Sequence, residues 1–576
     1  MDEQAAYGNS LVVPEYHVWT ADVRGGAVPV DPWMVGVVVA VGVTLGGWVL
    51  SVAAARRRRR VRSAALEAAW GSGSVAPTPV QEARRLFELM EGGPPPGAYR
   101  LDRQTWSDLD MDEVFGEMDH TVSCPGSQVL YAMLREPLLE ERRLEERRAV
   151  IEGFQEDPEL RTGVGLALWP LGHRGATRLA GLLWGPLPEL RSLEGSAPLL
   201  ALTAVGITAG CLLGVLPVPL LLGVFAVNTV VHFLHKRRTD HQPLGELARL
   251  ASVVVALSGP DLRRLGPAGA RIRDGAQVAG VVRRRLAPLL VDDGLGLTQY
   301  LKIFFLVDVL SYRAVHGVLT RHNELLRGLF LAAGEVDALR AMASYLGGRR
   351  VSCAPDHGAP RPGWSVRGMV HPLLETPVPN DFTMGAGAVL ITGSNMSGKT
   401  TFLKTLGVNA VLAQVCHRAL AAGYALPFLR VITSIGRADN LIEGRSYYLA
   451  EVESVHRIVS AAESREPHLL LLDEIFRGTN TAERIAGGYG VLRHLANGRH
   501  LVFVATHDGE LVDLLDGVYE VCHFTEEVGA EGLSFDYTLR PGPSTRSNAI
   551  ALLEFAGFPA GIVRDARRTL EARSGV

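Results

Sequence analysis

AVLITGSNMSGKTTFLKTLGVNAVLA, residues 388–413, decides the fold of this 576-residue chain. Ala388–Thr392 is an apolar run of strand length, and Thr401–Ala413 places apolar residues at helical spacing. Between them the loop GSNMSGKT has the spacing of a phosphate-binding loop, and the flanking strand and helix are the context that such a loop requires. The stretch therefore predicts a nucleotide-binding α/β domain.

Each part of this loop has a physical task. Glycines allow backbone N–H groups to converge on phosphate oxygens, and the helix N-terminus adds positive potential. Lys399 is expected to reach the β- and γ-phosphates and Thr400 to bind Mg²⁺, so the predicted ligands are ATP and Mg²⁺. The predicted nucleotide contacts are Gly393, Ser394, Asn395, Met396, Ser397, Gly398, Lys399, Thr400 and Thr401, together with Val378 upstream.

Two further strand ends supply candidate catalytic groups. Leu469–Leu472 is fully apolar and is followed by Asp473 and Glu474. We expect Asp473 to share the Mg²⁺ with Thr400, and Glu474 to orient and deprotonate the attacking water. A third apolar run, within HLVFVATHDGEL at 500–511, leads to His507, which is predicted to sense the γ-phosphate.

Two apolar segments predict membrane attachment. Trp33–Ala55 is 23 residues without a charge and is followed at once by Arg56–Arg60, which places the ATPase domain in the cytoplasm. The alternative for this segment is a buried core helix. Ala197–Phe233 is 37 residues long and is broken at Gly214 and by two prolines, which predicts a hairpin of two spans or, alternatively, a re-entrant hairpin. The predicted localisation is a multi-pass membrane protein with about three spans.

The predicted fold class is multidomain: an all-α core with transmembrane helices, then an α/β P-loop NTPase domain, then a C-terminal helical tail. The remaining segments show helical periodicity up to residue 345, and short apolar runs alternate with helices from Val351 onward. The predicted parts are an extracytoplasmic tail 1–32, a span 33–55, a linker and helix 56–104, a helical domain 105–345 interrupted by the hairpin 197–233, the ATPase domain 351–540 and the tail 541–576.

The net charge and the cysteine spacing argue against some kinds of partner and site. The net charge of −3 and the pI of about 6.6 provide no global attraction to nucleic acid. The five cysteines form no C-x-x-C pair, which argues against a zinc site or a disulfide framework.

Several motifs in this order resemble the MutS family of DNA mismatch-repair ATPases. TGSNMSGKTTFLK resembles that family's phosphate loop with Ser394 in place of the usual proline, and LLLLDEIFRGTNT resembles its acidic segment with Asn480 as the departure. ATHDGEL, VHPLLETPVPNDFTM and IEGRSYYLAEVESV also resemble family segments. Less specific likenesses are to the family's helical core at 108–138 and to its C-terminal tail at 539–571.

The resemblance implies a homodimer in which Ser446 contacts the γ-phosphate of the nucleotide held by the partner subunit. It also implies DNA as a possible partner, although no Phe-x-Glu of the mismatch-reading kind precedes residue 105. Two alternatives remain, a transporter-type ATPase and an ATPase that rearranges a membrane assembly without binding DNA. The chain has no L-S-G-G-Q signature, which disfavours the transporter.

Overall fold

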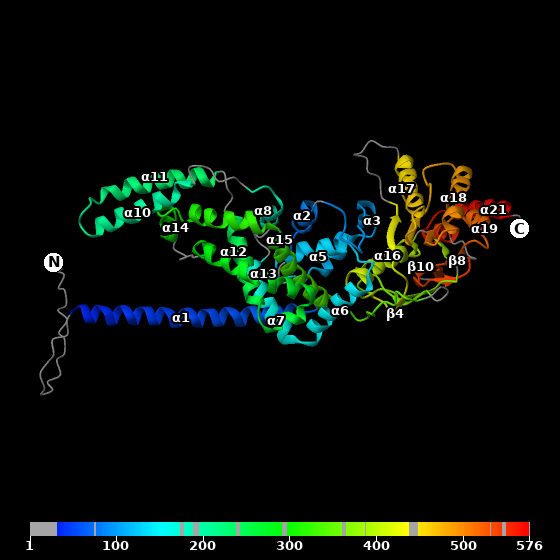
Figure 1. The fold of residues 1–576 in the computed structure, drawn as a ribbon. Helices are drawn as coiled ribbons and strands as arrows, with labels where there is room; N and C mark the ends of the chain where they lie inside the picture. The colour runs from blue at the N-terminus through cyan, green and yellow to red at the C-terminus, as the bar shows by residue number, and fades with distance from the viewer. Residues whose placement is uncertain are drawn as a thin grey trace, which may run out of the picture. The chain divides into compact units, whose positions relative to one another are not determined.

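The computed structural model describes residues 32–73, 77–90, 92–172, 178–187, 195–237, 242–290, 297–359, 364–385, 387–394, 396–436, 447–529, 532–543 and 549–574 (Figure 1). The chain divides into two compact units, Met1–Val61 and Arg62–Val576. The predicted N-terminal tail thus lies outside the described residues, apart from its last residue, Pro32.

Helix α1, Pro32–Ala69, runs without a break through the predicted span and the arginine run that follows it. The prediction of a helix over 33–55 is confirmed, and its placement in a membrane stays a prediction. Among the described residues, one helix is long and apolar enough to cross a bilayer, α11, Pro219–Lys236.

The helical region of the second unit is built around α15, Val307–Gly347, a 41-residue helix with non-helical dihedral angles at His322. Around it pack α5, Cys124–Arg135, α13, Gly266–Leu286, and α6, Glu141–Glu156. The other helices of this region are α2 Val80–Leu89, α3 Arg103–Asp108, α4 Met111–Met118, α7 Pro158–Leu168, α8 Arg178–Trp184, α10 Ala197–Leu212, α12 Gln242–Leu257 and α14 Leu297–Phe304.

A buried carboxylate joins α15 to α5. Asp337 is fully buried, and it accepts hydrogen bonds from the backbone N–H of Val122 at 3.1 and 3.2 Å and from Ser123 Oγ at 2.6 Å. Ser123 Oγ in turn accepts the N–H of Gly126 at 3.1 Å. A Cβ on Gly126 would lie 2.3 Å from Asp337 Oδ2, so only glycine permits this approach of the two helices.

The predicted hairpin is present as two helices. α10 and α11 pack against each other and are joined by residues 213–218, which contain the predicted break at Gly214. The arms are 16 and 18 residues long.

The C-terminal part is an α/β domain, as predicted. Its central sheet has the order β11-β8-β3-β7-β6-β5, in which the pairs from β8 to β5 are parallel and β11 is antiparallel. The strands are β3 Ala388–Thr392, β5 Arg430–Ser434, β6 His468–Asp473, β7 Leu501–Ala505, β8 Glu520–His523 and β11 Arg540–Pro541. A second sheet, β2-β1-β4, contains Asn380–Thr383, Ser365–Met369 and Gly423–Ala425, and β9, Glu526–Gly529, pairs with β10, Gly532–Phe535.

Both faces of the central sheet are covered, as the fully apolar strands require. Alternate residues of β3, such as Val389 and Leu390, belong to separate buried clusters on the two faces. α16, Lys399–Val415, covers one face, and α17, Tyr447–Ala462, and α18, Thr481–Ala496, cover the other together with α19, Gly509–Leu514. The chain ends with α20, Ala549–Phe555, and α21, Ala560–Ser574, as the prediction of a helical tail expects.

The hydrophobic core is continuous from the helical region into the α/β domain. α3 and the residues after it form polar contacts across this junction. Asp108 Oδ2 accepts hydrogen bonds from Thr433 Oγ1 at 2.7 Å and from the N–H of Ile435 at 3.0 Å. Lys404 of α16 forms an ion pair with Asp110 at 2.5 Å.

We predict that Asp337→Ala lowers the free energy of unfolding by about 3 kcal/mol or more. The substitution leaves the buried Val122 N–H and Ser123 hydroxyl without their acceptor and removes the contact that joins α5 to α15. Chemical denaturation of the full chain measures this change. Asp274→Ala, on the exposed face of α13, is the matched control and should change stability by less than about 0.5 kcal/mol. Equal effects of the two substitutions would contradict the assignment.

Candidate nucleotide-binding and hydrolysis site

The phosphate loop leaves the buried strand β3 and ends at the first residue of α16. Gly393 and Gly398 have φ angles of 140° and 105°, which only glycine adopts without strain. A Cβ on Gly393 would lie 2.9 Å from the carbonyl oxygen of Phe524 and 2.8 Å from Ser397 Oγ. The loop is therefore held between its own turn and the segment that follows β8.

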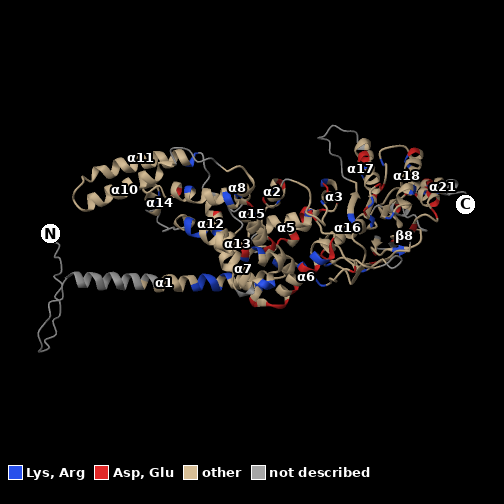
Figure 2. Ribbon diagram, viewed as in Figure 1, with Lys and Arg blue, Asp and Glu red and all other residues tan. Residues whose placement is uncertain are grey.

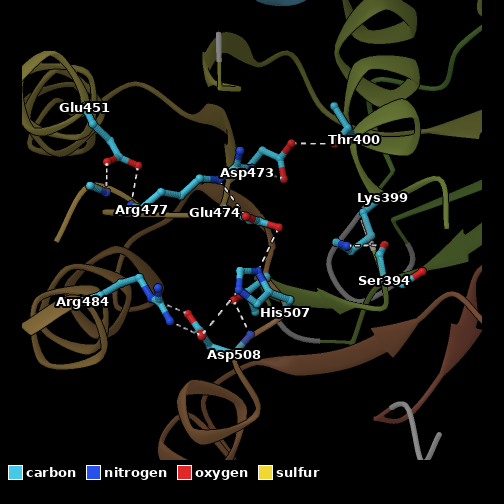
Figure 3. Close-up of polar contacts among 12 residues, drawn as sticks. Ser394, Lys399, Thr400, Glu451, Asp473, Glu474, Arg477, Arg484, His507 and Asp508 are labelled. Carbon is cyan, nitrogen blue, oxygen red and sulfur yellow. Dashed lines mark hydrogen bonds and ion pairs between the residues drawn. The ribbon is translucent and has the colours of Figure 1, made fainter. Parts of the chain in front are cut away.

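Lys399 is buried beneath this loop (Figure 3). Its Nζ donates to the carbonyl oxygens of Gly393 and Ser394 at 2.7 and 2.6 Å. Burial lowers the pKa of the Lys399 ammonium below its usual value, and the nearby carboxylates of Glu474 and Asp473 oppose that shift. The ammonium lies where phosphate oxygens can replace its two carbonyl partners.

Thr400 and Asp473 meet as the sequence predicted for a shared ion. Thr400 Oγ1 donates to Asp473 Oδ2 at 2.6 Å, and Asp473 is the last residue of β6. Burial raises the pKa of the Asp473 carboxyl, whereas the hydrogen bond from Thr400 lowers it. No cluster of three or more His, Cys, Asp or Glu ligands is found among the described residues. One hydroxyl and one carboxylate fit Mg²⁺, which takes its other ligands from phosphates and water.

Glu474 lies at the centre of an ion-pair network. Its φ is 51°, and its N–H donates to the carbonyl oxygen of Ala505 at 2.9 Å, which turns the chain sharply after β6. The two carboxylate oxygens face Arg477 Nε at 2.7 Å and His507 Nδ1 at 3.0 Å. Both oxygens of the predicted base are therefore engaged by cationic or polar partners.

The loop that carries His507 is fixed by its neighbour. Asp508 forms a two-point contact with Arg484 of α18, at 3.1 Å to Nε and 2.8 Å to Nη2. The N–H of Asp508 also donates to Thr506 Oγ1 at 3.1 Å. These contacts hold His507 beside Glu474 (Figure 3).

Glu451 is a site residue that the sequence reasoning missed. From α17 its carboxylate accepts the backbone N–H groups of Arg477 and Gly478 at 2.9 and 3.3 Å. Arg477 was missed as well, although it lies three residues after Glu474 in DEIFR. The available signal for Glu451 was its place five residues after Ser446 in GRSYYLAE.

The remaining predicted residues are placed in part. Ser446 and Asn395 lie outside the described residues. Met396 is 68% exposed, and Val378 is 37% exposed, with its carbonyl oxygen accepting from Asn380 Nδ2 at 3.3 Å. Thr401 is exposed in the first turn of α16, and Ser397 Oγ donates to the carbonyl oxygen of Ser394 at 2.8 Å.

A strand–loop–helix phosphate cradle, an acidic pair at the end of a neighbouring strand and a parallel sheet between helices define a P-loop nucleoside triphosphatase fold. Comparison with known proteins identifies the family. The family described as MutS domain V matches residues 389–573.

The relatives agree with this assignment. The chain is similar to the DNA mismatch repair protein MutS of Thermus aquaticus, with 29% identity over 83% of this chain and 64% of that protein. It is also similar to the DNA mismatch repair protein MutS 2 of Halobacterium salinarum, with 33% identity over 46% of this chain and 31% of that protein. These matches support a member of the MutS family, and the match spans less than two thirds of the length of the Thermus relative.

Ser394, which replaces the usual proline of the phosphate loop, has a side-chain hydrogen-bond partner. Ser394 Oγ donates a hydrogen bond to the Glu526 carboxylate, at the start of β9. The Glu526 charge also acts on the Lys399 ammonium. The Glu526 carboxylate, which contacts the phosphate loop from β9, repels an incoming polyphosphate.

We predict that Glu526→Gln tightens binding of a fluorescent ATP analogue about three- to tenfold at low salt, because the repulsion is removed. The gain should shrink at high salt, where the charge is screened. Glu463→Gln, an exposed and charge-matched change near the end of α17, should leave the Kd unchanged. Weaker binding by Glu526→Gln would show that the Ser394 contact supports the loop more than the charge opposes the ligand.

Proposed function

We propose that this protein binds and hydrolyses ATP with Mg²⁺ as a MutS-like ATPase. The observation that carries the proposal is the meeting of Lys399, the Thr400–Asp473 pair and Glu474 at one edge of the parallel sheet. Two segments of the chain supply these groups, the start of α16 and the end of β6. Their types are those that phosphoryl transfer to water requires: a cation, an oxygen ligand set and a base.

The proposed roles follow from the contacts. Lys399 gives up its two loop carbonyls and binds phosphate oxygens, while Thr400 and Asp473 hold Mg²⁺, which neutralises charge on the phosphates when bound. Glu474 orients a water molecule and takes its proton. Because Arg477 and His507 occupy both Glu474 oxygens, the water has to displace one of them before Glu474 can act as base.

We predict that Glu474→Gln keeps nucleotide binding and slows hydrolysis by about two orders of magnitude or more, since the amide cannot accept the proton. Single-turnover phosphate release measures the hydrolysis, and a fluorescent nucleotide titration measures the binding. Lys399→Ala is the comparison variant and should lose binding as well. Wild-type turnover by Glu474→Gln would move the base to another residue.

The proposed active form is a homodimer in which Ser446 of one subunit completes the site of the other. The family resemblance supports this arrangement. α20, α21 and the turn between them carry exposed apolar side chains at Phe555, Ile562 and Phe558 that a second copy can cover. Mixing two inactive variants tests it.

We predict that mixing Lys399→Ala with Ser446→Ala restores up to about half of the wild-type activity per mixed dimer. The mixed dimer contains one site with both lesions and one site with neither. Each variant alone is the control and should be inactive. Mixed dimers that form, as shown by a two-tag pull-down, and yet remain inactive would contradict the shared site.

DNA is the proposed partner, because the relatives are named as DNA mismatch repair proteins. Local basic groups, such as Arg283 and Arg284 in the last turn of α13, offer the phosphate contacts that the net charge does not. Salt-dependent binding of duplex and branched DNA by the full chain tests this part. A chain that hydrolyses ATP and binds no DNA would support the second candidate, an ATPase acting on a membrane assembly.

The second candidate rests on the apolar surface of α10 and α11. We propose that the chain is attached to a membrane through α1 and this hairpin, with the ATPase domain in the cytoplasm. The arginines after residue 55 and the Lys236–Arg237 pair at the end of the hairpin support that orientation.

A further inference from the structure

The α10–α11 hairpin presents a large apolar surface to its surroundings. The charge-coloured view shows both helices without charged residues along most of their length (Figure 2). Exposed side chains cover both arms and the turn: Leu199, Leu202, Val205, Leu212, Leu213, Val215, Val218, Leu220, Leu222, Val227, Val230 and Phe233. Soluble surfaces rarely leave so much contiguous apolar area uncovered, so the hairpin requires an apolar environment.

The C-terminal half of α11, from about Asn228 onward, differs from the apolar first half because one of its sides carries buried polar groups. Asn228 Nδ2 donates to the carbonyl oxygen of Phe304 at 2.5 Å, and the imidazole of His232 lies 3.6 Å from Asp308 Oδ2. All of these contacts join α11 to α14 and to the start of α15. The protein itself therefore covers one face of α11 from about residue 228 inward.

α14 packs against α11 near Phe225 and Asn228. The rings of Phe304 and Phe225 stack with centroids 6.5 Å apart, and α14 meets α15 at 67°. Two residues of α14, Tyr300 and Leu301, are 63% and 56% exposed, and Lys302 on the same helix donates to the carbonyl oxygen of Leu289. A short helix with exposed Tyr and Leu beside a lysine is typical of the membrane interface.

The lengths decide how deep the hairpin can go. The nine residues from Pro219 to Val227 rise about 13 Å, while the hydrocarbon core is about 30 Å thick. If α14 lies at the interface, the turn reaches about the middle of the bilayer. If the turn instead reached the far side, Lys302 and Asp308 would lie near the middle of the bilayer, where charged side chains are strongly unfavourable.

We propose that the α10–α11 hairpin enters only the near leaflet of a lipid bilayer, with α14 in the interface as its depth stop. Val230 and Phe233 then lie within the headgroup region, and Lys236 and Arg237 lie beside the headgroups, where they favour anionic lipid. This inference rests on the proposed membrane attachment and chooses between the two forms of the hairpin that the sequence leaves open. It makes the hairpin a one-sided anchor for the helical region.

Thiol labelling of the full chain in phosphatidylcholine–phosphatidylglycerol vesicles tests the depth. In a background with Cys211, Cys353 and Cys522 replaced by serine, Leu213→Cys puts a single exposed thiol at the turn. A membrane-impermeant maleimide is either added outside or trapped inside. We expect the turn thiol to react from neither side and to react fully after detergent is added.

Glu463→Cys in the same background is the matched control, because it is exposed in the ATPase domain and marks the molecules whose domain faces outward. Reaction of the turn thiol from the lumen in those molecules would show two full spans, which overturns the inference while the attachment stands. Reaction from outside at the control rate would show that the hairpin is not inserted, which overturns both.

Fluorescence quenching gives an independent readout of depth. Trp33 and Trp48 of α1 are first replaced by phenylalanine, and the same chain without an introduced tryptophan gives the background. Lipids brominated deep in the acyl chain should then quench Leu213→Trp more than lipids brominated near the headgroup. Tyr300→Trp should show the reverse order. Strongest quenching of Leu213→Trp by shallow bromines would place the turn at an interface and contradict insertion to mid-depth.

Discussion

The register of three parallel strands is the constraint on which the site depends. β7 lies between β3 and β6, and its last residue, Ala505, pairs with Ile391 on one side and with Asp473 on the other. The carboxyl ends of the three strands therefore coincide. The phosphate loop, the acidic pair and the His507 loop all begin at that edge, so ordinary backbone pairing brings together groups from positions 393 to 507. A slip of one residue in any pair would turn these side chains to the opposite face.

The local sequence pattern was enough to predict the strands and loops at this edge of the sheet. The expected strand Ala388–Thr392 is β3, and the expected strand Leu469–Leu472 lies within β6. The contact between Thr400 and Asp473 followed from the motif, because strand ends in one parallel sheet share an edge. The hairpin was also predictable from sequence, since Gly214 lies between two apolar runs whose helices carry no Asp, Glu, Lys or Arg before Lys236 at the end of α11. In the structure Gly214 has a φ of 71°.

What the sequence did not predict depends on distant contacts. Glu451 binds backbone groups 26 and 27 positions away, and Ser394 meets Glu526 at a separation of 132. No periodicity or spacing encodes such a pair, because each depends on how helices and loops pack on the sheet. The same holds for the depth that we propose for the hairpin, which we infer from the contact of Asn228 with Phe304 and not from the hydropathy of either arm.

In the described state the charged groups of the site satisfy one another. Lys399 binds its own loop, Thr400 binds Asp473, and Glu474 is shared between Arg477 and His507. Release of Glu474 requires Arg477 or His507 to move, and the backbone of Arg477 is held by Glu451 of α17. α17 is in turn tied to the helical region, where Arg457 pairs with Asp102 at 2.5 Å and Ser454 accepts a hydrogen bond from Gln104.

These contacts connect the nucleotide site to the helical region. α17 contacts α3 and its N-terminal cap through Gln104 and Asp102, and α3 is bound to β5 through Asp108. The groups that restrain the base are therefore joined to the helical region by one contiguous set of contacts through α17 and α3.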